Sequence, residues 1–247
     1  MPGLPGTPVA SAAEALERAA VAAETRTALT PRPNQWIFTK ERVSFLTPGP
    51  NKGQVNYGWG RVDGKGAAFL DENGKLRFRP TIKPPEGRHA SKLPPDPWSY
   101  PAITTLPIDP DALLRWVRRS SGGSDWAAEA YDQLAAILRR GGLVPPKVEA
   151  AAFRAMAKLP GVKLVANGTP VGGHATLAVG RTNGSLREEV LLDRNTFAYR
   201  GEWTQLVRED VGFERAKGIG PVGRAKGTVW LFERLVTATV DKPGQLP

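Results

Sequence analysis

The sequence predicts an α+β fold in which a curved antiparallel sheet, or half-barrel, packs on an N-terminal helix and a central group of three helices. Two blocks rich in aromatic residues, 36–79 and 197–232, favour pleated sheet. A helical block, 109–158, lies between them. Neither aromatic block has enough strands to be stable alone, so we expect one shared sheet. Alternation of single strands and helices is absent, which argues against a parallel sheet.

Length and composition fit a folded domain. A chain of 247 residues with 40% hydrophobic residues can bury a core. We expect residues 1–10 to form a flexible N-terminal segment and residues 11–247 a single domain. The first eight residues lack the basic and apolar regions of a signal peptide. No apolar run approaches the roughly 20 residues that span a bilayer.

The N-terminal helix is predicted over Ser11 to Arg26. Ser11 and Glu14 have the spacing of a capping box, in which each side chain satisfies a free backbone N–H group at the helix start. An apolar stripe at helical spacing follows, and it is mostly alanine, which allows close packing. Its members are Leu16, Ala19, Ala20 and Ala23.

Alternating residues and turn dipeptides predict the early strands. Asp63-Gly64 and Asn73-Gly74 are hairpin signals because glycine tolerates a positive φ. An irregularity near Lys40 interrupts the alternation of the first strand. The predicted strands are Gln35 to Leu46, Gln54 to Val62, Ala67 to Leu70 and Leu76 to Arg79.

A proline-rich connection, Thr81 to Pro107, follows the early strands. Long segments of this kind are uncommon in compact domains and often act as lids or binding loops. The plainer interpretation is a surface connection.

Three helices are then predicted. Asp109-Pro110 combines a capping residue with proline at the first helical position, and that helix runs to about Ser120. Ser124 is expected to cap a second helix that ends at Arg140, before two glycines. Pro145-Pro146 begins the third, which ends at Lys158.

The late block is predicted to be strand again. The clearest hairpin is at Asn183-Gly184. Residues Asp193 to Thr196 have the chemistry of a tight turn, because short polar side chains bond their own backbone there. The predicted strands are Val162 to Ala166, His174 to Arg181, Leu186 to Leu192, Phe197 to Val207 and Thr228 to Val240.

No catalytic or metal-binding pattern is present in the sequence. Residues Gly218 to Gly223 have the spacing of a dinucleotide fingerprint but are not followed by a helix. His89 and His174 lack neighbouring ligand residues. Glu188 and Glu189 are adjacent on a strand, so they point to opposite faces. The chain has no cysteine. We therefore expect no enzyme activity, no metal and no cofactor.

The formal charge of +10 has several interpretations. It can reflect a soluble basic surface, or attraction to anionic lipid, cell-wall polymer or nucleic acid. The basic residues are scattered among acidic ones. We therefore expect attraction to anionic surfaces to be non-specific and salt-sensitive, with no sequence-specific binding of nucleic acid.

Several segments resemble a family of uncharacterised membrane-anchored proteins of high-GC Gram-positive bacteria. They are Asn34 to Lys40, Leu106 to Leu114, Leu159 to Val162 and Leu191 to Glu202. The resemblance implies an exported domain whose element order is similar to the LolA/RseB-like half-barrel, a fold that holds acyl chains or senses envelope stress. It supplies no catalytic residues. It implies an extracytoplasmic location with an anchor outside this chain; a chain complete as given would be cytoplasmic.

We therefore expect a non-enzymatic, monomeric, extracytoplasmic ligand-binding or sensory domain. The ligand would be apolar or amphipathic, or a protein partner, on the concave sheet face. The expected pocket is lined by the early aromatic block, and the proline-rich segment is its expected lid. The alternatives are a basic envelope protein that binds a protein partner or anionic polymer, and an enzyme with an unrecognised site. The candidate binding residues are Trp36, Phe38, Tyr57, Trp59, Phe197, Tyr199 and Trp203.

Overall fold

The computed structural model describes residues 9–46, 53–79, 99–120, 125–208 and 226–247. The helices are α1 (Ala12–Glu24), α2 (Tyr100–Thr104), α3 (Pro110–Ser120), α4 (Trp126–Arg139), the 3₁₀ turn η2 (Gly141–Leu143) and α5 (Pro146–Ala157). The strands are β1 (Trp36–Phe45), β2 (Gln54–Arg61), β3 (Ala67–Leu70), β4 (Leu76–Phe78), β5 (Lys163–Val171), β6 (His174–Asn183), β7 (Leu186–Asp193), β8 (Tyr199–Leu206) and β9 (Val229–Val240).

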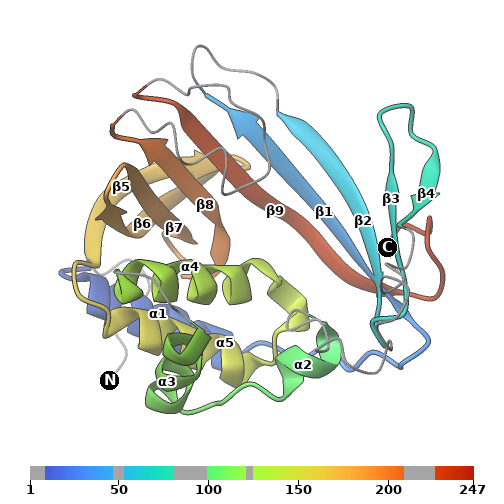
Figure 1. Ribbon diagram of the computed structural model, residues 1–247, viewed down its shortest axis with the longest axis horizontal. Coiled ribbons are helices and arrows are strands. Elements are labelled where there is room, and N and C mark those ends of the chain that lie inside the picture. Colours follow the sequence, from blue (N-terminus) through green and yellow to red (C-terminus); the bar gives the residue numbers. More distant parts are fainter. Residues whose placement is uncertain (1–8, 47–52, 80–98, 121–124, 209–225) are drawn as a thin grey trace, which may run out of the picture.

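All of these strands belong to one antiparallel sheet of nine strands, in the order β4-β3-β2-β1-β9-β8-β7-β6-β5. Strand β9 pairs with β1 on one side and β8 on the other, so it joins the two aromatic blocks. The sheet arches over the helices and stays open, with β4 and β5 at its edges (Figure 1). The predicted α+β class, with both blocks sharing one sheet, is confirmed.

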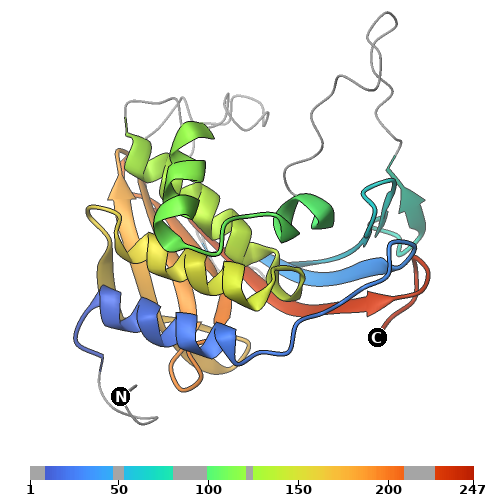
Figure 2. The same cartoon turned by 90° about the horizontal axis from the view of Figure 1, so that it is seen from below.

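The largest core lies between the helices and the sheet face that they cover, which we call the inner face. Helices α1 and α5 lie side by side (Figure 2), and both contribute alanines to this core. Small side chains allow the two backbones to approach closely. Val179, Val190 and Leu192 supply the sheet side of the same core. Every residue of the predicted α1 stripe is buried.

The start of α1 follows the predicted capping scheme with one change. The Glu14 backbone N–H donates to Ser11 Oγ at 3.1 Å. The Glu14 carboxylate accepts from the backbone N–H of Ala10, at 2.9 Å, rather than from that of Ser11. The two side chains therefore still satisfy donors at the helix start.

A second cluster lies on the opposite, outer face. Its members are Phe38 and Trp59, each 1% exposed, with Ala68 and Val240, and the partly buried Trp36 and Tyr57 pack against them. We call the four aromatic residues the outer aromatic cluster. The Trp59 indole N–H donates to the backbone oxygen of Gln245 at 2.8 Å. The C-terminal segment therefore helps to cover this cluster.

A β-bulge separates the two halves of β9. Lys40 pairs with Val236 but Glu41 pairs with Arg234, so Leu235 is an extra residue. Because successive strand residues alternate between faces, an extra residue reverses the alternation. Val236 and Val240 consequently pack on the outer face, whereas Phe232 lies on the inner one. The register of β1 against β9 does shift at Lys40, where an irregularity was predicted, but the extra residue lies in β9, and β1 itself pairs with β2 without a break.

The helical region differs from the prediction at two places. Helix α4 is capped by Asp125, whose side chain accepts from the Ala128 N–H at 3.0 Å, so the prediction of Ser124 as cap is wrong. Ser124 itself lies outside the described residues. Short helix α2 occupies part of the segment expected to be irregular. The helix tolerates Pro101 because this residue falls in its first turn, where no backbone N–H donor is needed. Residues 80–98 lie outside the described residues.

The late hairpins also differ slightly from prediction. The β6–β7 loop consists of Gly184 and Ser185, one residue later than expected, with Gly184 at φ +51°. Strand β8 begins at Tyr199 rather than Phe197, because Phe197 adopts a left-handed φ of +58°. Strand β5 extends to Val171, beyond the predicted end at Ala166.

No helix in the described part of the chain is both long and apolar enough to cross a membrane.

Candidate functional site

A groove of about 480 Å³ lies between α4 and the inner face of β1, β9, β8 and β7. Each of these strands presents two alternate residues to it. They are Val43 and Phe45 from β1, Trp230 and Phe232 from β9, Glu202 and Thr204 from β8, and Glu188 and Val190 from β7.

The strand register divides the groove floor into two halves. Val43 pairs with Phe232, and Phe45 pairs with Trp230, so β1 and β9 form an apolar half. Glu202 pairs with Val190, and Glu188 pairs with Thr204, so β8 and β7 form a mainly polar half. The halves meet where β9 pairs with β8, with Phe232 beside Glu202.

The aromatic residues of the apolar half remain partly open to solvent. We call Phe45, Trp230 and Phe232 the groove aromatics. Phe45 is 38% exposed, and its ring meets that of Trp230 edge-on, with centroids 6.3 Å apart. The Arg139 guanidinium lies 5.1 Å above the Phe232 ring. An apolar ligand would therefore find aromatic surface that the fold has not buried.

Helix α4 forms the other wall of the groove. Asp132, Ala135, Ala136 and Arg139 follow helical spacing and line it together. The two alanines leave space that larger side chains would fill. Tyr131 fixes the helix to the sheet, since its hydroxyl donates to Val179 O at 2.7 Å and accepts from Val190 N–H at 3.0 Å. Burial raises the pKa of Tyr131, so the phenol stays neutral.

Arg139, the last residue of α4, forms an ion pair with Glu202. Arg139 Nε donates to Glu202 Oε1 at 3.1 Å, and its Nη2 donates to the other carboxylate oxygen. The Tyr199 hydroxyl also donates to Glu202, at 2.7 Å. Burial would lower the pKa of Arg139, but the adjacent carboxylate raises it above the ordinary value. Both charges of this pair are therefore already compensated within the protein.

Arg234 lies deeper, beneath the junction of α4 and η2. Its guanidinium donates to Leu138 O at 2.8 Å and to Tyr199 O at 3.1 Å, and it lies 4.6 Å above the Tyr199 ring. Burial lowers the pKa of Arg234. Glu41 is its cross-strand partner, and within the described part of the chain the Glu41 carboxylate makes no hydrogen bond or ion pair. Burial raises the pKa of Glu41, while nearby arginines oppose that change.

The residues predicted as a binding face lie in three separate places. Trp36, Phe38, Tyr57 and Trp59 form the outer aromatic cluster. Phe197 and Tyr199 belong to the core beneath the helices. Trp203 packs with an outer-face cluster that includes Leu231 and also borders the groove. The early aromatic block as a whole therefore does not line the groove, so the predicted pocket lining is corrected. The proline-rich segment predicted as a lid falls largely outside the described residues.

The groove aromatics were not among the predicted site residues. Their sequence signal was the alternation of Val43 with Phe45 and of Trp230 with Phe232. That alternation shows that the residues of each pair share a face, but it does not say which face remains open.

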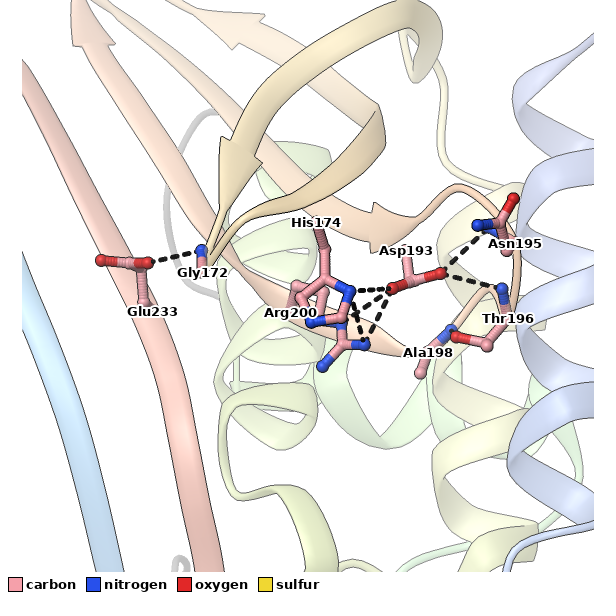
Figure 3. A network of polar contacts seen from close by, with 8 residues as sticks. All are labelled: Gly172, His174, Asp193, Asn195, Thr196, Ala198, Arg200 and Glu233. Carbon is pink, nitrogen blue, oxygen red and sulfur yellow. Dashed lines mark hydrogen bonds and ion pairs between the residues drawn. The ribbon is translucent and has the colours of Figure 1, made fainter.

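The opposite end of β7 is fixed by a network around the buried Asp193 (Figure 3). Its Oδ1 accepts from the backbone N–H groups of Asn195 and Thr196, at 3.0 and 2.9 Å. Its Oδ2 accepts from Arg200 Nη2 at 2.8 Å and lies 3.4 Å from His174 Nδ1. Burial would raise the pKa of Asp193, but these backbone donors and Arg200 together lower it to about 2. The predicted turn chemistry is confirmed.

A second contact in Figure 3 ties the β5–β6 hairpin to β9. The Gly172 N–H donates to Glu233 at 3.1 Å, and Glu233 also binds Arg42 at 3.1 Å. Glu233 is 4% exposed, so both contacts are made by a buried carboxylate. These interactions satisfy charges that the fold buries. No group of three or more potential metal ligands occurs among the residues that the structure describes.

Glu188 and Glu189 lie on opposite faces, as predicted. Glu188 lies on the inner face, in the groove, while Glu189 binds Arg187 at 2.5 Å. Arg187 also lies 5.3 Å above the ring of Trp203, another residue that pairs with Glu189 across the sheet.

Comparisons with known proteins leave the chain without an assigned family. No protein-family model matches it. No curated protein matches it in sequence. Among solved structures, a DUF1329 family protein from Desulfovibrio piger aligns over 90% of this chain and 90% of its own, at 9% identity and a TM-score of 0.23. A likeness this slight carries no argument about this chain.

Proposed function

We propose that this chain is a non-enzymatic ligand-binding or sensory domain, and that an apolar or amphipathic small molecule binds in the groove beside α4. The observation that carries the proposal is the aromatic wall of that groove, formed by Phe45, Trp230 and Phe232. Small-molecule sites are typically concave, roughly 300–1,000 Å³ in volume, and mainly apolar with a few polar groups. The groove, at about 480 Å³, has this size and composition.

The energetic argument concerns the exposed aromatic surface. Moving a fully exposed phenylalanine side chain out of water is worth roughly 1.5–3 kcal/mol, and a partly exposed ring contributes a share of that free energy in proportion to its open area. Phe45 is 38% exposed, and Trp230 and Phe232 are partly exposed. A ligand that covers these three rings therefore gains free energy that the fold itself has not used.

The rigidity of the site supports binding with little rearrangement. Tyr131 holds α4 to the neighbouring strands β6 and β7 through two hydrogen bonds. The Arg139–Glu202 ion pair holds the C-terminal end of α4 to β8. A preformed site loses less conformational entropy on binding than a flexible one.

An extracytoplasmic, membrane-anchored location is part of the proposal. It rests on the sequence resemblance stated above. Expression of the full-length gene product, followed by fractionation and protease accessibility in intact cells, tests this part independently of ligand binding.

The binding test uses N-phenyl-1-naphthylamine, a neutral apolar probe that fluoresces when removed from water. We expect micromolar binding to the wild-type chain. Phe232→Ala should weaken it at least tenfold, and Ala136→Trp should block it by filling the groove. Phe78→Ala is the matched control, because Phe78 is 61% exposed on β4 and outside the groove. Equal binding by all four proteins would refute the groove as the site, and an absence of binding would favour an envelope interaction protein.

A further inference from the structure

We infer that the exposed face of α3 docks on the surface of an anionic lipid bilayer, and that three arginines make the contact. They are Arg115, Arg118 and Arg119, which we call the α3 arginine face. This inference goes beyond the proposed function, because the groove lies on the opposite side of α4, between that helix and the sheet. The two surfaces can therefore be tested separately.

The fold places α3 on the outside of the helical region. Helix α3 packs against α4 and α5, and Figure 1 shows α4 between α3 and the sheet. Leu113 and Val117, one turn apart, are fully buried in the main core. The side of a helix opposite its buried stripe points to solvent. The α3 arginine face lies on that side, and all three of its members are exposed.

The three arginines are neighbours on one helical surface. Arg118 and Arg119 follow Arg115 by three and four residues, and residues at this spacing lie side by side. Like charges at this spacing destabilise a helix. The helix dipole favours cations in the last turn, which accounts for Arg118 and Arg119. It does not account for Arg115, which lies one turn earlier.

The charge of this face is not paired within the described part of the chain. No ion pair there joins one of the three arginines to a carboxylate. Asp111, one turn before Arg115, binds Lys158 Nζ at 2.5 Å and acts on Arg115 only more weakly, through space. Arg118 lies 4.7 Å above the ring of Trp126, and that contact leaves its charge in place. The face therefore presents a local excess of positive charge.

Other arginines of the fold are paired. Arg139, Arg154 and Arg181 each bind at least one carboxylate. Basic residues are scattered among acidic ones along the sequence, which predicts only diffuse attraction to anionic surfaces. Because folding pairs many of these charges and leaves three together on α3, the attraction should be concentrated on this helix.

The neighbours of the arginines favour lipid as the partner. Trp116 lies one turn before Arg119, Trp126 lies beneath Arg118, and both indoles are partly exposed. Tryptophan side chains are favoured at the boundary between lipid head groups and hydrocarbon. Ile108, just before the first turn of α3, is 59% exposed. A bilayer offers phosphate and hydrocarbon together, so it matches both the charges and the apolar side chains.

The expected affinity is moderate. Each arginine near an anionic bilayer surface strengthens binding by about fivefold, so three strengthen it on the order of a hundredfold. Attraction of this kind falls as salt screens the charges. The inference is therefore one of reversible docking on the bilayer surface.

The test measures co-sedimentation of the wild-type chain with two kinds of vesicle at low salt. One is pure phosphatidylcholine, and the other is an equal mixture of phosphatidylcholine and phosphatidylglycerol. We expect the chain to bind the mixed vesicles at least tenfold more tightly than the neutral ones, and added salt should remove the difference. Equal binding to both kinds of vesicle would overturn the inference.

Paired substitutions locate the contact. Arg115→Gln combined with Arg119→Gln should weaken binding to the mixed vesicles at least tenfold. Arg115→Lys combined with Arg119→Lys should preserve it, because the charge is kept. The matched control is Lys65→Gln combined with Lys75→Gln, which removes the same charge at exposed turns of the early strands. Phe232→Ala, in the groove, should leave vesicle binding unchanged.

Three results would overturn the inference. If the lysine pair weakens binding as much as the arginine pair, the attraction is diffuse. If the glutamine variants of α3 lower the thermal midpoint but still bind vesicles as the wild type does, the arginines serve the helix alone. If a DNA duplex binds more tightly than the mixed vesicles and the same arginine variants abolish that binding, the partner is nucleic acid. Circular dichroism confirms that each variant is folded.

Discussion

The outer aromatic cluster and the groove aromatics lie on one sheet, yet the first has a fully buried centre, Phe38 and Trp59, whereas every ring of the second is partly open. Phe38 and Trp59 are each 1% exposed and pack against Val240 and Ala68. Phe45 is 38% exposed beside the partly exposed Trp230. All of these side chains lie on strands, so local structure does not distinguish them.

The two sets of aromatic residues differ in exposure because different parts of the chain pack against them. The outer aromatic cluster meets the C-terminal segment, whose Gln245 accepts a hydrogen bond from Trp59. The groove aromatics meet a side of α4 that offers Ala135 and Ala136, which are too small to fill the space. In this groove the aromatic strand residues stay partly open because the helix side that faces them is made of small residues.

The largest expected effect tests the covered side of this comparison. Trp59→Ala should destabilise the fold by about 3–5 kcal/mol, the usual cost of removing a buried aromatic side chain. Phe232→Ala should cost much less, since Phe232 is only partly buried. Urea unfolding of both variants provides the measurement. Similar losses of stability would show that the groove aromatics are part of the core.

The same comparison bears on the sequence-based expectation that Trp59 belongs to the ligand-binding face, which the apolar probe N-phenyl-1-naphthylamine can test. In the structure Trp59 lies on the outer face, away from the groove. We now expect the folded fraction of Trp59→Ala to bind the probe with wild-type affinity. Weakened binding at full folding would restore the early block as a ligand surface.

The next effect concerns the anchoring of the late strands at the end opposite the groove. The pKa of Asp193 is about 2 in the folded protein against 3.8 for the free side chain, so its carboxylate stabilises the fold above pH 4. This stabilisation, about 2 kcal/mol, is lost as the pH falls from 4 to 2. The difference in unfolding free energy between wild type and Asp193→Asn should therefore shrink over that range. A constant difference would show that the charge is unimportant.

A smaller effect compares a turn of the late half with a strand of the early half. Gly184→Val should cost about 1 kcal/mol because Gly184 has φ +51°, which a β-branched residue resists. A Cβ atom at Gly184 would meet no atom within 4 Å, so the expected cost comes from backbone strain rather than from a clash of that atom. Gly60→Val is the matched control, since its site is equally empty but lacks the positive φ. Equal thermal midpoints for the two variants would contradict this explanation.

The smallest effect is expected at Glu41, between the two regions. Burial raises its pKa above the ordinary value, so holding it ionised at pH 7 costs stability that protonation at lower pH restores. Glu41→Gln should therefore raise the unfolding midpoint slightly at pH 7, and the gain should shrink as the pH is lowered toward 4. A lower midpoint at pH 7 would show that attraction to the nearby arginines outweighs the burial.

Most of the fold could be predicted because its signals are local. Ser11 caps α1, Asp109 caps α3 through the Ala112 N–H, and the glycines at 64, 74 and 184 adopt the positive φ that their turns require. The groove could not be predicted, because it depends on which side of α4 meets which strands. The sequence shows that Phe45 shares a face with Val43, but only the tertiary packing shows that this face is left open.

The bulge at Leu235 means that the number of residues in β9, and not only their identity, decides which side chains face the groove. Read by strict alternation, Trp230, Phe232, Val236 and Val240 would share one face, and the extra residue divides them between the groove wall and the outer core. Deleting Leu235 would force one of these two sets to the wrong side without changing any other residue. In comparing relatives of this chain, the number of residues between Phe232 and Val236 is therefore as informative as the residues themselves, because a single-codon deletion there would remove either the groove wall or the outer core.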